Sequence, residues 1–188
     1  VGSGRRRRHD VVVIGGGIAG LSTAVSAMSE GAEVILLEKA PKLQRGGNSS
    51  IADAQIRYPH ESDEYCPTPQ TKEDFFKTFM RVSRGRANKD LIQVVVDNAA
   101  DVVDWLTEMG IAWEKGYPNV AGYRRQPVGG GWKLVDTLYK HLERAGAHIA
   151  YETSAETLLT DRSGRVVGVR ALEPDGYTDI KADGGVVI

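Results

Sequence analysis

The stretch HDVVVIGGGIAGLSTAVSAMSEGAEVILLEK, residues 9–39, decides the fold. Its apolar run at 11–14 predicts a strand, a glycine turn and a helix follow, and a second apolar run at 34–37 predicts another strand. Strand, helix and strand in this order form a βαβ unit, in which a helix joins two parallel strands. The stretch therefore predicts an α/β protein built on a parallel sheet.

Three glycines in this stretch have the G-x-G-x-x-G spacing of dinucleotide-binding folds. Gly15 lets the chain turn tightly, Gly17 allows the backbone to approach a pyrophosphate, and Gly20 packs the helix against the strand. The free N–H groups at the start of the helix, at Ile18 and Ala19, are expected to face the phosphates.

An acid closes the second predicted strand. Glu38, followed by Lys39, lies where a carboxylate accepts hydrogen bonds from ribose hydroxyls and repels a 2′-phosphate. The strand, the glycines, the helix, the second strand and the acid follow one another at the spacing of the motif. This combination favours dinucleotide binding over a purely structural βαβ unit. The pattern alone does not distinguish FAD from NAD, since both cofactors present the same ADP half to the protein.

The composition of the chain argues against several other classes of protein. The chain has 188 residues, enough for one domain with a real core, and a formal net charge of -1, which gives no case for nucleic-acid binding. No apolar run approaches the ~20 residues that span a bilayer. The single cysteine, Cys66, excludes an internal disulfide framework. The four histidines lack metal-ligand spacing, so no metal is expected: His9, His60, His141 and His148.

The first residues, VGSGRRRRHD, carry four arginines. A twin-arginine export signal is disfavoured, because the apolar run that follows is the first predicted strand. Residues 1–9 are therefore interpreted as a solvated basic extension or a cloning remnant, residues 10–188 as the domain, and the expected location is cytoplasmic.

The rest of the chain predicts three helices and a meander. Thr71 is an N-cap with Asp74 three residues on, so a helix is expected over 71–84, and Gly110 ends a second helix that begins near 88. A loop is expected over 114–131, a helix over 132–145, and a strand followed by a β-meander over 147–188. The second helix is predicted to bury one apolar face: Leu91, Val94, Val95, Ala99, Val102, Val103, Leu106 and Met109, with Trp105 also in the core.

Several segments together resemble the FAD-binding half of the fumarate reductase and succinate dehydrogenase flavoprotein family. They are DVVVIGGGIAGLSTA, VILLEK, RGGNS, VVDWLTEMGI and GGGWKLVDTLYKHLERAGAHIAYETSAETLLTDRSGRVVGV. The resemblance covers nearly the whole chain and implies a Rossmann-like FAD-binding domain with a parallel sheet, a helical insertion and a C-terminal β-meander. Within the family, APKLQRGGNS and GGGWKLVDTLY are most similar to FAD-dependent tricarballylate dehydrogenases.

The resemblance gives the glycine-rich segment after the second strand a role. In such flavoproteins this loop runs along the pyrophosphate and ribityl chain toward the isoalloxazine, and Arg45 begins it here. Gly46 and Gly47 would let the backbone approach the cofactor, and Asn48 and Ser49 could supply side-chain hydrogen bonds. The alternative is a flexible surface turn.

Two further expectations about the cofactor follow from the resemblance. Membrane-bound relatives carry a histidine near this loop that attaches covalently to the flavin, whereas this chain has Asn48, Ser49 and Ser50, so the FAD is expected to be non-covalent. Ser154 and Ala155 would present strand backbone to the adenine, or be purely structural strand residues.

For catalysis, the family implies hydride transfer between a substrate carbon and flavin N5, with an arginine that exchanges the proton. Those groups belong mainly to a capping domain and a C-terminal FAD-binding segment, and both are expected to be missing from 10–188. Arg57 is the candidate carboxylate clamp within the chain, with an ordinary surface arginine as the alternative, and His60 is a further candidate.

The sequence thus predicts the FAD-binding part of an oxidoreductase that acts on the CH–CH bond of a di- or tricarboxylate, with an unidentified electron donor or acceptor. One alternative is another flavoprotein of the same group, such as a ketosteroid dehydrogenase, whose substrate pocket would be apolar. The other is a nucleotide-binding fragment without chemistry.

Overall fold

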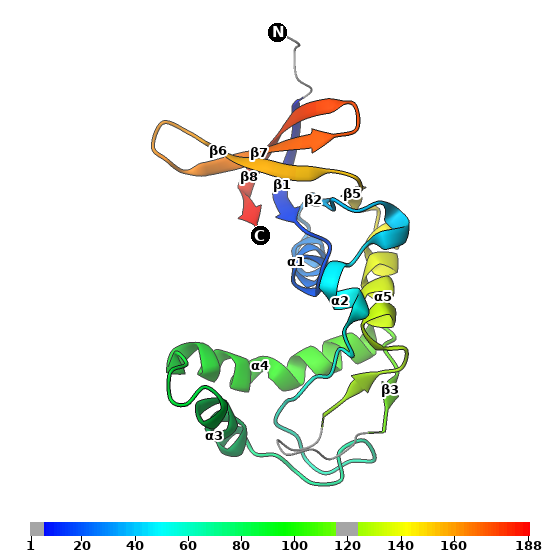
Figure 1. Cartoon of the computed structure of the whole chain (residues 1–188), viewed down its shortest axis with the longest axis vertical. Helices are drawn as coiled ribbons and strands as arrows, with labels where there is room; N and C mark the ends of the chain where they lie inside the picture. The colour runs from blue at the N-terminus through cyan, green and yellow to red at the C-terminus, as the bar shows by residue number, and fades with distance from the viewer. Residues whose placement is uncertain (1–5, 116–123) are drawn as a thin grey trace. The chain divides into compact units, whose positions relative to one another are not determined.

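The computed structural model describes residues 6–115 and 124–188 of the chain (Figure 1). The chain divides into two compact units: unit 1 is Val1–Ala52 with Leu134–Ile188, and unit 2 is Asp53–Lys133. Residues 1–5 of the predicted extension and 116–123 of the predicted loop lie outside the described residues.

Unit 1 is built on a six-stranded sheet of order β5-β2-β1-β8-β7-β6. The strands β5, β2, β1 and β8 run parallel, whereas β7 is antiparallel to β8 and β6 is antiparallel to β7. The mixed α/β fold, the βαβ unit and the meander are therefore confirmed. The strands are β1 (Arg6–Ile14), β2 (Val34–Leu37), β5 (His148–Ala150), β6 (Ser154–Thr160), β7 (Val166–Glu173) and β8 (Gly176–Val187).

Strand β1 begins earlier than the apolar run predicts. Residues 6–9 pair with residues 179–182 of β8, and Arg7 makes an ion pair of 2.5 Å with Glu173. The solvated extension predicted for 1–9 therefore needs correction at 6–9, which belong to the sheet. Polar residues extend the strand here because a partner strand from the other end of the chain satisfies their backbone, and this partner leaves no mark on the local sequence.

Two helices of unit 1 carry most of its remaining core. Helix α1 (Ile18–Ser29) packs against β1 and β2 and buries Leu21 and Ala24. A Cβ on Gly20 would lie 1.9 Å from the carbonyl oxygen of Gly15, so only glycine permits this close packing. Helix α5 (Gly130–Arg144) ends before Gly146, as predicted, and the residues it buries in unit 1 are Leu134, Val135, Leu138, Tyr139 and Leu142.

Unit 2 contains two helices and a short ribbon. Helices α3 (Lys72–Val82) and α4 (Lys89–Glu108) pack on each other, and β3 (Trp113–Glu114) pairs with β4 (Gln126–Pro127). The Thr71 hydroxyl accepts the Asp74 N–H at 3.1 Å and donates to the Asp74 carboxylate at 2.8 Å. The predicted cap of the first helix is confirmed.

The predicted buried face of α4 is only partly right. Val103 and Leu106 are buried as expected, but the helix also buries Ile92 and Val96, and Trp105 is half-buried. The cause is that apolar residues surround much of the first half of α4, so periodicity alone does not select the face that packs on α3. Four residues of the predicted face are exposed instead: Leu91, Val94, Val95 and Val102.

Adjacent valines of α4 test this orientation. Val96 is 1% exposed and packs in a cluster with Phe75 and Ile92, whereas Val95 is 46% exposed. We expect Val96→Ala to lower the free energy of unfolding by roughly 2 kcal/mol, because it removes buried methyl groups and leaves a cavity. Val95→Ala, the matched control, should change it by less than about 0.5 kcal/mol in urea unfolding. Equal effects of the two substitutions would contradict the orientation.

Candidate cofactor site

A pocket of about 390 Å³ lies at the carboxyl ends of β1 and β2 in unit 1. Ligands of open parallel sheets bind at this edge, because the loops that follow the strands converge there. Four segments form its wall: the glycine turn after β1, the end of β2 with the two residues after it, Gly47, and the start of β6 with the residue before it. The lining residues are Ile14, Gly15, Gly16, Gly17, Leu37, Glu38, Lys39, Gly47, Thr153, Ser154 and Ala155.

The Glu38 carboxylate is held in this wall by hydrogen bonds. The side chain is buried, with Oε2 accepting the Gly16 N–H at 3.1 Å and Oε1 accepting the Ala40 N–H at 2.9 Å. The Tyr139 hydroxyl, from α5, donates to Oε2 at 3.4 Å. The acid predicted to meet a ribose therefore lies at the pocket and is bonded directly to the glycine turn.

Gly16 is not one of the three glycines of the G-x-G-x-x-G spacing, yet it is the most tightly enclosed glycine of the turn. A Cβ on it would lie 1.7 Å from the Tyr139 hydroxyl oxygen and 2.5 Å from Glu38 Oε2. Gly15 has the positive φ of +95° that a tight turn needs, and a Cβ there would meet no atom within 4 Å. The run of three consecutive glycines was the only local signal for Gly16.

The glycine-rich segment after β2 is partly helical, which corrects the expected open loop. Residues 42–44 form a 3-10 turn, η1 (Lys42–Gln44), and α2 (Gly47–Ile51) follows. Gly46 has φ of +100°, and its Cβ would lie 2.6 Å from Val135 of α5. The Ser49 hydroxyl accepts the Ile18 N–H at 3.1 Å, so it caps α1, whose own N-cap, Gly17, has no side chain.

Arg45 is buried but is not among the pocket-lining residues. Its guanidinium donates to Asp136 at 3.1 Å, to Glu143 at 3.0 Å and to the Tyr151 hydroxyl at 2.9 Å. It also lies over the Tyr139 ring, 4.4 Å from the ring centroid. These contacts tie the start of the glycine-rich segment to α5.

The charged groups around Arg45 stabilise one another's ionised forms. Burial opposes the charge on Arg45, but the hydrogen bond from its guanidinium to Tyr151 and the Glu143 and Asp136 carboxylates outweigh it and raise the pKa of Arg45. A hydrogen bond from Lys42 and the charge of Arg45 lower the pKa of Glu143. The ion pairs therefore persist through the neutral range.

The remaining predicted residues divide by location. Lys39, Gly47, Ser154 and Ala155 line the pocket, as does Thr153, which the sequence analysis missed although it lies two residues before Ala155. Asn48 and Ala19 are exposed near the turn. In unit 2, Arg57 is half-buried, and the ring nitrogens of His60 lie 2.8 and 3.1 Å from the backbone oxygens of Tyr58 and Thr68.

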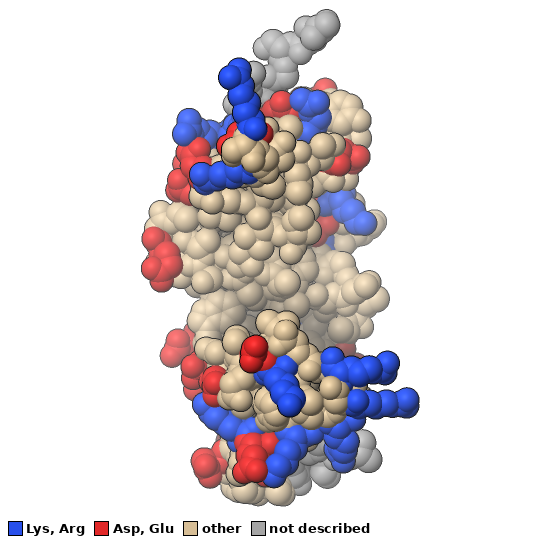
Figure 2. Space-filling view, turned by 90° about the vertical axis from the view of Figure 1, so that its left-hand side faces the viewer, with Lys and Arg blue, Asp and Glu red and all other residues tan. Residues whose placement is uncertain are grey.

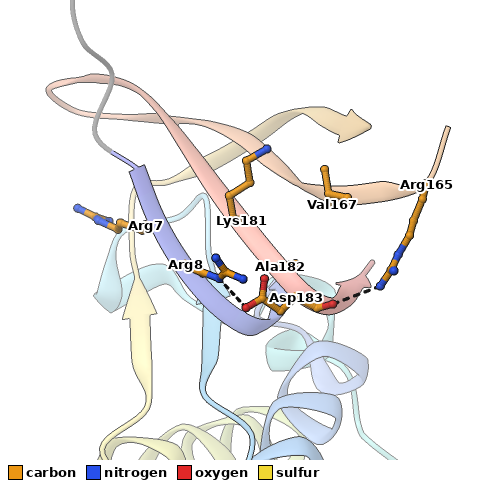
Figure 3. Close-up of a pocket in the computed structure, with 7 residues that line it drawn as sticks. All are labelled: Arg7, Arg8, Arg165, Val167, Lys181, Ala182 and Asp183. Atoms are coloured by element: carbon orange, nitrogen blue, oxygen red, sulfur yellow. Dashed lines mark hydrogen bonds and ion pairs between the residues drawn. The ribbon is translucent and has the colours of Figure 1, made fainter. Parts of the chain in front are cut away.

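A second hollow, at the amino end of β1, is lined by basic residues (Figure 3). Its arginines are largely paired within the protein: Arg8 donates to the Asp183 carboxylate at 2.6 Å and Arg165 to the Asp183 carbonyl at 3.2 Å. On the face shown in Figure 2, lysines and arginines lie among aspartates and glutamates, in keeping with the net charge of -1.

Two features are absent from residues 6–115 and 124–188, a metal-binding cluster and a membrane-spanning helix. No group of three or more His, Cys, Asp or Glu side chains in that part of the chain is arranged to hold a metal ion. None of its helices combines the length and the apolar character needed to cross a membrane. Cys66 is buried and unpaired by any disulfide.

Gly16→Ala tests the enclosure of the turn. We expect it to abolish measurable ADP binding and to lower the free energy of unfolding by about 1–3 kcal/mol, because the new methyl group overlaps Tyr139 and Glu38. Gly185→Ala is the control, since a Cβ there meets no atom within 4 Å. Adding Tyr139→Phe to Gly16→Ala should restore part of the stability. Wild-type ADP affinity in Gly16→Ala, measured by calorimetry, would refute this description of the turn.

Comparison with known proteins agrees with this geometry. Fumarate reductase (cytochrome) of Shewanella frigidimarina is 31% identical over 182 residues, which cover 93% of this chain and 32% of that protein. The open conformation of a flavocytochrome c3 fumarate reductase superposes with a TM-score of 0.86 at 25% identity, covering 96% of this chain and 33% of the other.

A 3-ketosteroid-Δ4-(5α)-dehydrogenase from Rhodococcus jostii RHA1 superposes equally well, with a TM-score of 0.86 at 23% identity, covering 96% of this chain and 45% of the other, and shows the same fold. The chain thus spans about a third of the length of the fumarate reductase that it matches. The model of the FAD binding domain family matches residues 10–188. The chain belongs to the FAD binding domain family.

Proposed function

We propose that residues 10–188 form the FAD-binding part of a flavin-dependent oxidoreductase that acts on a CH–CH bond beside the carboxylates of a di- or tricarboxylate. The observation that carries the proposal is the pocket at the carboxyl ends of β1 and β2, in a chain that matches the FAD binding domain family. The fumarate reductase of Shewanella frigidimarina supports the carboxylate class of substrate.

The pocket residues fit the ADP half of FAD. Beside Gly15 there is open space, and α1 begins at the same turn, where a pyrophosphate needs donors and room. The Ile18 N–H, expected to face the phosphates, is donated to Ser49 instead, so the donors proposed here are the N–H groups that follow it. Glu38 keeps acceptor capacity for a ribose hydroxyl. Ser154 and Ala155 bring strand backbone to the pocket beside the position proposed for the adenine.

The chain's own contribution to the reaction is to bind and orient. Bound flavin supplies the capacity to accept or give a hydride, and the protein decides where its reactive ring lies. The segment 45–50 is rigid enough for this task, because Arg45 is anchored to α5 and Ser49 to the first turn of α1. We propose Gly46, Gly47, Asn48 and Ser49 as the residues along which the cofactor extends from the ADP pocket, and Arg57 as a carboxylate contact.

Activity of the product of the complete reading frame that encodes these residues tests the proposal. We expect reduction of fumarate or an unsaturated tricarboxylate with a reduced viologen dye, or oxidation of tricarballylate with an oxidising dye, at about 1 per second or faster. The parallel assay uses 4-androstene-3,17-dione. Turnover of the steroid alone would replace the carboxylate proposal with the ketosteroid one. FAD binding without turnover of either class would favour a nucleotide-binding role.

The mode of flavin attachment is a separate prediction. Because no histidine lies between Gly46 and Ser50, we expect the FAD to be non-covalent. Acid precipitation of the FAD-loaded 188-residue chain should leave the yellow colour in the supernatant, while the protein pellet is colourless. Flavin fluorescence on the denatured polypeptide after gel electrophoresis would show a covalent link and disprove this prediction.

A further inference from the structure

Helix α5 places a fully buried hydroxyl beside the acid of the cofactor site. The Tyr139 hydroxyl lies 3.4 Å from Glu38 Oε2, the same oxygen that accepts the Gly16 N–H. The ring that carries this hydroxyl is fixed, because Arg45 lies over it and is itself held by Asp136. The Tyr139 hydroxyl oxygen is therefore held beside Glu38 Oε2.

The hydrogen bond from Tyr139 matters because it takes up part of the acceptor capacity of Glu38. A carboxylate has about four acceptor positions, two on each oxygen. Gly16 and Tyr139 fill those of Oε2, whereas the one donor to Oε1 within residues 6–115 and 124–188 is the Ala40 N–H. One position on Oε1 is left for an outside donor at the pocket that Glu38 lines.

The hydroxyl is also a permanent donor. Burial, and then the nearby Glu38 carboxylate, hold the pKa of Tyr139 far above its ordinary value. The hydroxyl therefore keeps its proton through the neutral range and can donate it to an acceptor. Within the described residues, the contact it makes with an acceptor is the one to Glu38.

We infer that Tyr139 is a positioning residue for the cofactor: it occupies Glu38 Oε2 and so presents Oε1 to the 2′-hydroxyl of the adenosine ribose. This inference rests on the proposed FAD binding and deepens it, since it assigns α5 a part in selecting the nucleotide. It predicts that Tyr139 acts only through Glu38 and only on ligands that carry the ribose hydroxyl.

A double-mutant cycle on the 188-residue chain tests the inference, with ADP and 2′-deoxy-ADP as probes. Tyr139→Phe should weaken ADP about three- to tenfold, the effect of one lost hydrogen bond. In a Glu38→Gln background the same change should have no further effect, because the group through which Tyr139 acts is already altered. The preference for ADP over 2′-deoxy-ADP should fall in Tyr139→Phe. This ratio does not depend on how much of the sample is folded.

Tyr151→Phe is the matched control, because it removes a neighbouring hydroxyl that bonds to Arg45 and Glu143. Its ADP affinity should stay within twofold of wild type. Wild-type preference for ADP in Tyr139→Phe, or additive effects of Tyr139→Phe and Glu38→Gln, would overturn the inference. Failure of the wild-type chain to bind either FAD or ADP would instead overturn the proposed function on which it rests.

Discussion

The hydrogen bond from the Gly16 N–H to the Glu38 carboxylate is the constraint on which the site depends. It joins the end of β1 to the end of β2 at 3.1 Å, in a place where neither partner can reach water easily. Leaving a buried carboxylate without its donors costs far more than the bond itself contributes, so both strand ends must stay in place together. The glycine turn is therefore shaped by its neighbours as much as by its own flexibility.

Helix α5 extends this constraint to the segment after β2. Arg45 and Lys42 bind acids of the helix, and Gly46 packs on Val135 with no room for a side chain. The chain can then lead Ser49 to the first turn of α1. Because the Arg45–Asp136 pair is largely buried and such a pair is costly to break one partner at a time, this attachment gives precision of position more than net stability.

What the sequence predicts well is local. The βαβ unit, the caps of α3 and the meander follow from patterns within about 30 residues, since hydrophobic period, glycine spacing and capping residues act over one or two elements. Glu38 was found for the same reason. Tyr139 is not predictable in this way, because it lies 101 positions from Glu38, and a separation of 91 positions hides the ion pair of Arg45 with Asp136 from any local pattern. The packed face of α4 also required knowledge of its partner helix.

The position of β8 has a consequence for how the protein is made. It lies between β1 and β7, so the centre of the sheet joins a strand near the amino end of the chain to residues 176–187. Pairing across so long a loop is slow to form, and β1 has its final neighbour on only one side until β8 leaves the ribosome. During synthesis, β1 therefore has an open edge along which another nascent chain can pair until β8 takes its place.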